Sequence, residues 1–117
     1  MADRIIRIAN EMRKVISDLL MYELKDPRIP VMTSVMHIKL AKDLKYAKVY
    51  VSVYGTDEEK AKAIAALKSS SGFIKHEIGK RMIIRAMPEL TFEIDNSIER
   101  GAYMSEMIDK TIKKDDM

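Results

Sequence analysis

The part of the chain best suited to chemistry with another molecule lies between Lys68 and Arg85. It contains a single acid, Glu77, and five basic residues: Lys68, Lys75, Lys80, Arg81 and Arg85. Side chains of this kind bind the phosphate oxygens of nucleic acids. A run of small residues, Ser70–Gly72, lies among them, and its backbone amides are open to a phosphate. A glycine that closes a helix between solvated charges gives the same pattern, so both interpretations stay open here.

Residues that would support catalysis or hold a metal or cofactor do not form a pattern. There is no cysteine, and the two histidines, His37 and His76, fall on different predicted elements, so no metal site is expected. The four glycines match neither a P-loop nor a dinucleotide fingerprint, and the run Ser69–Ser71 lacks a nucleophile elbow. We therefore predict that the protein is not an enzyme and has no cofactor or small-molecule substrate.

Length and composition predict one globular domain over residues 1–117. An apolar fraction of 47% and a charged fraction of 33% exclude a disordered chain. Charges in the first apolar run argue against a signal peptide, and no stretch approaches the roughly 20 apolar residues of a membrane helix. With no cysteine to form a disulfide, we expect a cytoplasmic monomer without a membrane partner. Because the net charge is only +3, nucleic-acid binding depends on where the charges lie.

Residues 3–24 are predicted to form one long helix. Its apolar stripe follows three- and four-residue spacing: Ile5, Ala9, Met12, Ile16 and Leu19 or Leu20. The opposite stripe is expected to neutralise itself through pairs four residues apart: Arg7 with Glu11 and Lys14 with Asp18. Arg4 and Arg13 lie outside these pairs, which makes them candidates for contact with another molecule. Pro27 then ends the helix.

Two strands, 32–41 and 46–54, are predicted to form an antiparallel hairpin. In the first strand, the apolar side is expected to carry Met36, Ile38 and Leu40. In the second, one face carries Ala47, Val49, Val51 and Val53, and the other carries Tyr46, Lys48, Tyr50, Ser52 and Tyr54. Tyrosines beside lysine on an open sheet can stack RNA bases. We favour the alternative, cross-strand partners on a solvated face, because no phenylalanine-rich signature of a base-stacking sheet is present.

Two helices, a third strand and a fourth helix complete the predicted order α-β-β-α-α-β-α. Thr56 and Glu59 form a capping box for a helix that ends near Lys68. A kink is expected at Ser70–Gly72, because serine and glycine are poor helix formers, and a third helix continues toward Arg85. Alternation over 90–95 predicts the third strand, and the last helix extends from 97 to about 113. The core is expected over about 4–110, with a frayed tail at 111–117.

This element order matches a type II KH domain, an RNA-binding fold in which a GXXG loop joins two helices and clamps the nucleic-acid backbone. No GXXG is present, and the chain instead resembles the ribosome-binding factor A family of small bacterial proteins. The matching residues occur in order along the chain: Lys25-Asp26-Pro27-Arg28, Asp43-Leu44, Ala47-Lys48-Val49-Tyr50-Val51-Ser52, Gly72-Phe73-Ile74, Ile78-Gly79, Arg85, Pro88-Glu89-Leu90-Thr91-Phe92, Asp95 and Ser97-Ile98. The family's helix–kink–helix carries Ala-x-Gly, where this chain has Ser70-Ser71-Gly72.

The resemblance implies an α+β fold: a single type II KH-like domain with a three-stranded sheet and helices packed on one face. It also implies a ribosome-assembly factor that binds the immature small (30S) ribosomal subunit and its 16S rRNA. Such a factor supports 5′-end maturation of the precursor rRNA and is important in the cold. A general single-stranded RNA-binding KH module is the alternative, and a protein–protein scaffold that uses the tyrosine-bearing sheet face is a third hypothesis.

The predicted RNA surface combines the kink with the basic residues around it. Its main part consists of Ser70, Ser71, Gly72, Lys75, His76, Lys80, Arg81 and Arg85. Arg4, Arg13, Lys25 and Arg28 are expected to extend it. For Lys25-Asp26-Pro27-Arg28, a structural turn is as good an explanation as direct RNA contact.

Overall fold

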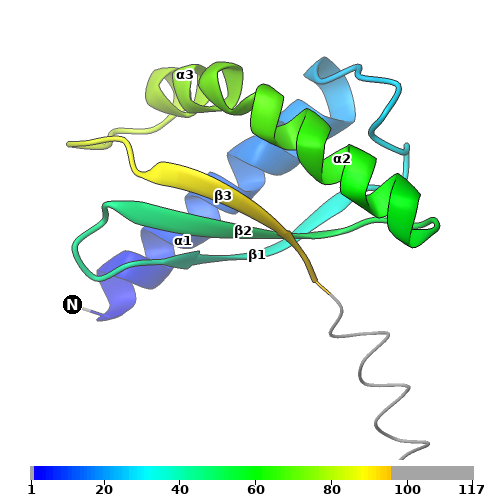
Figure 1. Cartoon of the computed structure of the whole chain (residues 1–117). Coiled ribbons are helices and arrows are strands. Elements are labelled where there is room, and N and C mark those ends of the chain that lie inside the picture. Colours follow the sequence, from blue (N-terminus) through cyan, green and yellow to red (C-terminus); the bar gives the residue numbers. More distant parts are fainter. Residues whose placement is uncertain (1, 96–117) are drawn as a thin grey trace, which may run out of the picture.

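The computed structural model describes residues 2–95 and shows the predicted order of helices and strands (Figure 1). The elements are α1 (Ala2–Asp18), the π-helical turn η1 (Leu19–Glu23), β1 (Ser34–Leu40), β2 (Tyr46–Ser52), α2 (Asp57–Ser69), α3 (Ser71–Arg81) and β3 (Glu89–Ile94). The α+β class is therefore confirmed. The predicted last helix over 97–113 and the tail over 111–117 lie outside the described residues.

The three strands form one sheet in the order β1-β2-β3. β1 and β2 pair antiparallel, as predicted, whereas β2 and β3 pair parallel. A parallel pair needs a long crossover connection, which α2 and α3 provide. In the middle of the sheet, Val49 of β2 lies opposite Ile38 on one side and Phe92 on the other.

The helices pack on one face of this sheet, as the sequence predicted. Along β2 the apolar residues Ala47, Val49 and Val51 are fully buried, while the alternate residues Tyr46 and Lys48 are exposed. The helices supply the other half of the core through Met12, Ile16, Leu19, Leu67, Ile74 and Ile78, all fully buried. In Figure 1, α1 runs obliquely behind the strands, where it packs mainly on β1. Within residues 2–95, the side chains on the opposite sheet face are largely exposed.

The predicted inward side of β1 is wrong at its start. The register of β1 on β2 shifts between Val35 and His37, which indicates a β-bulge. A bulge adds one residue to one strand and reverses the alternation before it. As a result Val35 is buried, whereas Met36 is 37% exposed. Ile38 and Leu40 face the core as predicted.

The first helix runs to Glu23, close to the predicted end, but its last turn is a π-helix. The amide of Leu24 donates to the carbonyl of Leu19 at 2.6 Å, which closes this wider turn. The apolar stripe of α1 is buried as expected at Ala9, Met12 and Ile16. The predicted pairs Arg7–Glu11 and Lys14–Asp18 are wrong, since in residues 2–95 these side chains form no ion pair.

The helical break falls at Ser70, within the predicted range. Ser70 has φ −93° and ψ 2°, and α2 ends before it while α3 begins after it. Gly72 lies in the first turn of α3, and a Cβ there would meet nothing within 4 Å. The predicted extension of the third helix toward Arg85 is wrong. Met82 is extended (φ −129°, ψ 149°), and residues 82–88 form a loop that turns back to β3.

Candidate nucleic-acid interface

The loop after η1 lies directly against the α2–α3 kink. Arg28 donates a hydrogen bond to the Ser69 hydroxyl at 3.2 Å, across 41 positions of sequence. The Ser69 hydroxyl lies 3.0 Å from the Ala66 carbonyl and 3.1 Å from the Ala65 carbonyl, to which it donates in turn. The tertiary structure thus brings together two predicted parts of the RNA surface. Sequence reasoning missed Ser69 as the contact point, because no local signal links it to Arg28.

Arg28 is also the partner of Asp26. Its guanidinium binds the Asp26 carboxylate at 2.8 Å, and its backbone amide donates to the same carboxylate at 2.9 Å. The side-chain hydrogen bond, and after it the backbone one, hold the pKa of Asp26 below its ordinary value, and the side-chain hydrogen bond raises the pKa of Arg28. Both groups are therefore charged at neutral pH, and Arg28 is a turn-forming residue whose half-exposed guanidinium also reaches the kink.

The basic residues of α3 are mostly paired with acids. Lys75 approaches Glu89 at 3.4 Å, and Lys80 approaches Glu77 at 3.5 Å. Arg81 binds Glu77 at 3.2 Å and also contacts Glu23 of η1. The hydrogen bond to Glu23, followed by that to Glu77, raises the pKa of Arg81.

These ion pairs hold the basic side chains of the predicted cluster in different directions. Lys75 is held toward β3 and Arg81 toward the end of the first helix, where it ties η1 to α3. His76 and Lys80 are exposed and lie four residues apart, so they share one face of α3. The Lys80 ammonium is itself exposed, although its partner Glu77 is buried, so it is open to a second anion such as a phosphate. Ser71 is half-buried, whereas Gly72 is exposed.

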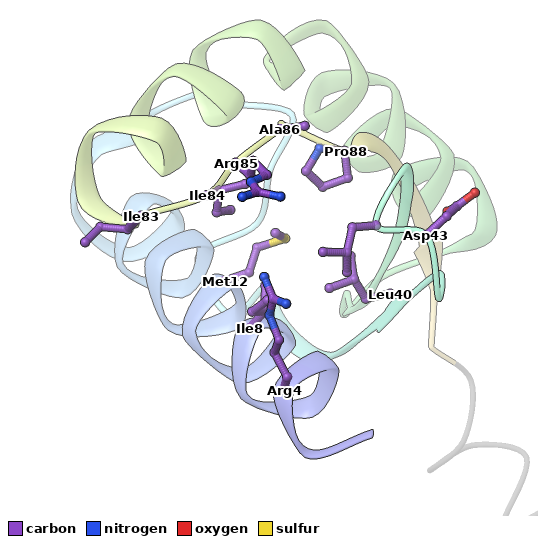
Figure 2. A pocket seen from close by; sticks show the side chains of 11 residues that line it. Arg4, Ile8, Met12, Leu40, Asp43, Ile83, Ile84, Arg85, Ala86 and Pro88 are labelled. Atoms are coloured by element: carbon purple, nitrogen blue, oxygen red, sulfur yellow. The ribbon is translucent and has the colours of Figure 1, made fainter. Parts of the chain in front are cut away.

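Four predicted residues lie outside α3: Arg4, Arg13, Lys25 and Arg85. Within residues 2–95, none of their side chains forms an ion pair or a hydrogen bond. Arg13 is half-buried on α1, and Lys25 is exposed in the loop that leads to Arg28. Arg4 and Arg85 are exposed and, although far apart in sequence, line the same pocket from opposite sides (Figure 2). This juxtaposition was not predicted, because Arg85 was expected on a helix.

The tyrosine-bearing sheet face carries cross-strand pairs. His37 and Tyr50 stack with ring centroids 4.4 Å apart, and Lys48 approaches Glu93 at 3.8 Å. Tyr46 and Tyr54 are the most exposed aromatic rings near this face. This arrangement agrees with the favoured interpretation of a solvated face with cross-strand partners.

Within the part of the chain that the structure describes, no three His, Cys, Asp or Glu side chains gather as metal ligands would. None of the helices in that part combines the length and apolar character of a membrane span.

Comparison with known proteins places the chain in one family. The model of the family described as ribosome-binding factor A matches residues 4–108. Ribosome-binding factor A of Acetivibrio thermocellus is 52% identical over 93% of this chain and 89% of its own length. That of Caldanaerobacter subterraneus subsp. tengcongensis is 49% identical over the same shares.

Solved structures agree with this comparison. The solution structure of a putative ribosome-binding factor A from Thermotoga maritima is similar at a TM-score of 0.71 and 31% identity, over 80% of this chain and 88% of that chain. The crystal structure of ribosome-binding factor A from Thermus thermophilus shares the fold at a TM-score of 0.67 and 23% identity, over 75% of this chain and 91% of its own. By sequence and by fold, the chain belongs to the ribosome-binding factor A family.

Proposed function

We propose that this protein is an assembly factor that binds the immature small (30S) ribosomal subunit and contacts its 16S rRNA around the α2–α3 kink. In this role it supports 5′-end maturation of the precursor rRNA, matters most in the cold, and acts in the cytoplasm as a monomer. Family membership supports the proposal. A similar structure also supports it: a homology model of Thermus thermophilus ribosome-binding factor A fitted into the cryo-EM map of a complex with the 30S subunit.

The observation that carries the proposal is the open kink. α2 stops and α3 starts around Ser70, and a Cβ at Gly72 would meet nothing within 4 Å. KH domains contact the nucleic-acid backbone where their two helices meet, because a junction without bulky side chains lets a phosphate approach the amides. Arg28, which reaches Ser69, supplies positive charge near this junction, and the exposed Lys80 adds charge about two turns further along α3.

Binding alone is sufficient for such a role. A protein that binds one conformation of an RNA more tightly than the others increases the population of that conformation without any reaction of its own. The described residues offer phosphate contacts of this kind. The α2–α3 kink therefore acts as a clamp on folded rRNA in this proposal.

A ribosome-gradient profile of the tagged protein tests the proposal. We expect the protein to co-sediment with free small subunits and to be absent from translating ribosomes. Deletion of the gene is expected to accumulate precursor rRNA with an unprocessed 5′ end, most strongly in the cold. Normal processing in the cold would count against the role in maturation, and tight binding to many unrelated oligonucleotides would favour a general single-stranded RNA-binding module.

A charge substitution locates the surface. Lys80→Gln removes an exposed charge of α3, and Lys39→Gln removes an exposed charge of β1 as the matched control. Each lost phosphate contact is expected to lower the log–log salt slope of RNA binding by about 0.7. An unchanged slope in the Lys80 variant would move the surface away from this face of α3. Arg81 is less suitable for this test, since it also joins α3 to η1.

A further inference from the structure

A pocket of about 160 Å³ lies away from the kink, between α1, the β1–β2 turn and the loop that follows α3 (Figure 2). No residue of α2 lines it. Its walls are mainly apolar and come from Ile8, Met12, Leu40, Leu44, Ile84 and Pro88. Figure 2 shows the Met12 sulfur facing the hollow from α1. The pocket is thus assembled from three segments that are distant in sequence.

Two arginines stand at this pocket without a carboxylate partner. In Figure 2 the side chains of Arg4 and Arg85 extend toward the hollow from opposite sides. Neither forms an ion pair or hydrogen bond with another described residue. Asp43 also lines the pocket, but its carboxylate accepts the Lys45 amide at 3.0 Å and turns away from both arginines in this view. The positive charge at the mouth is therefore left unneutralised, which favours an anion there.

The β1–β2 turn holds one wall of the pocket in an uncommon conformation. Leu44 has φ 62°, the left-handed region that bulky side chains rarely occupy. Glycine or asparagine is the usual choice at such a position. A leucine here places an apolar side chain in the pocket wall at the expense of backbone strain. Ile83, from the loop that follows α3, also lines the pocket and is fully exposed.

We propose that this pocket holds one unstacked nucleotide of a single-stranded RNA segment. The base lies against the apolar wall, and its flanking phosphates bind Arg4 and Arg85. A nucleotide combines a flat apolar ring with adjacent anionic groups, which is the combination that this pocket complements. The inference rests on the proposed RNA-binding role but concerns a second site, whose lining includes no residue of α2 or α3.

Methionine methyl groups provide direct reporters of occupancy. Met12 lies in the pocket wall, whereas Met21 is exposed in η1 and Met32 is exposed in the loop before β1. The full-length protein, labelled with ¹³C at the methionine methyls, is titrated with a six-nucleotide single-stranded RNA. We expect the Met12 resonance to shift through the ring current of the base, while Met21 and Met32 stay unchanged. Nucleoside monophosphates should shift Met12 more weakly, and inorganic triphosphate should leave it in place.

Two variants separate the charged part of the pocket from the apolar part. Arg85→Gln is expected to weaken binding of the oligonucleotide about tenfold, as for a lost charge-assisted hydrogen bond, and to lower the salt slope by about 0.7. Leu44→Gly removes one apolar residue of the wall and tolerates the positive φ, so the fold is expected to persist while the Met12 shift becomes smaller. Lys39→Gln, on the open sheet face, is the matched control and should change neither the RNA affinity nor the Met12 shift.

The outcomes distinguish this site from the proposed function. If the protein binds the RNA and Lys80→Gln weakens this binding, but the Met12 resonance does not shift, the pocket inference is wrong and the kink surface stands. If Met12 shifts with an acidic peptide and not with RNA, the pocket is a protein-binding site and the inference is also wrong. If the protein binds neither RNA nor small subunits, the proposed function fails, and the pocket inference fails with it.

Discussion

Gly72 offers a test in which stability and binding are expected to change in opposite directions. It lies in the first turn of α3, its φ is not in the left-handed region, and a Cβ there would meet nothing within 4 Å. Packing in the described residues therefore does not require glycine. If the site is kept open for an RNA backbone, a side chain at this position should stabilise the fold and obstruct the ligand.

The expected magnitudes follow from these observations. Gly72→Ala restricts the unfolded chain and suits a helix, so it should stabilise the protein by about 0.4–1 kcal/mol. For a domain of this size, that corresponds to a rise in Tm of roughly 2–5 °C. Gly72→Leu should retain this gain, because leucine is also a good helix former, but it covers the junction. We expect it to weaken binding to small subunits about tenfold or more, which is at least about 1.4 kcal/mol.

The assay combines thermal unfolding by circular dichroism with co-sedimentation on free small subunits. Gly79→Ala is the control, since it lies two turns further along α3, where a Cβ would meet only the Met87 methyl at an ordinary 3.6 Å. It should raise Tm similarly and leave binding unchanged. A fall in Tm for Gly72→Ala would refute the reasoning about open space. A stable Gly72→Leu protein that binds subunits as tightly as the unaltered one would refute the role of the kink.

Three further outcomes are expected for the isolated protein. Thr56→Ala removes the hydroxyl that accepts the Glu59 amide at 3.1 Å, so chemical unfolding should show a loss of about 1 kcal/mol. Hydrogen bonds from the Arg28 side chain and from the Thr56 backbone hold the pKa values of Asp26 and Glu59 below those of the unfolded chain. The stability they contribute is therefore present at neutral pH and is lost as the pH falls through the lowered pKa values of the folded protein. Tm measured from pH 6 to pH 3 should therefore drop less in Glu59→Gln than in the unaltered protein, and an equal drop would contradict this account. Arg81→Gln leaves the buried Glu77 with Lys80 alone, so Tm should fall and amide exchange in η1 should become faster, whereas Lys62→Gln, which loses only an exposed pair on α2, should change neither.

The sequence predicted the elements well where local chemistry is strong. The capping box at Thr56 and Glu59 begins α2 as predicted, and its two hydrogen bonds are formed. The poor helix formers around Ser70 mark the break. The alternation in β2 assigns every residue to the correct face. In each of these cases the information lies within a few residues, so pattern and propensity suffice.

The errors occur where a distant contact decides the geometry. Because of the bulge in β1, Val35 and not Met36 faces the core. Pairing with β2 sets this register, and the side-chain alternation of β1 alone does not. The third helix ends at Arg81 because the chain must return from there to begin β3 beside β2. The charges of α1 do not pair four residues apart as its own spacing suggests.

By itself the sequence determined the fold class, the order of the elements and the presence of a kink flanked by basic residues. These properties follow from hydrophobic periodicity and local propensity, which act over short distances along the chain. Only the tertiary structure decided which basic residues are neutralised by acids and which remain free. It placed Glu89 against Lys75 and Glu23 against Arg81, and it brought Arg4 and Arg85 to one apolar pocket. Electrostatic interactions depend on distance in space, so the packing of the helices on the sheet sets the charge pattern that a partner meets.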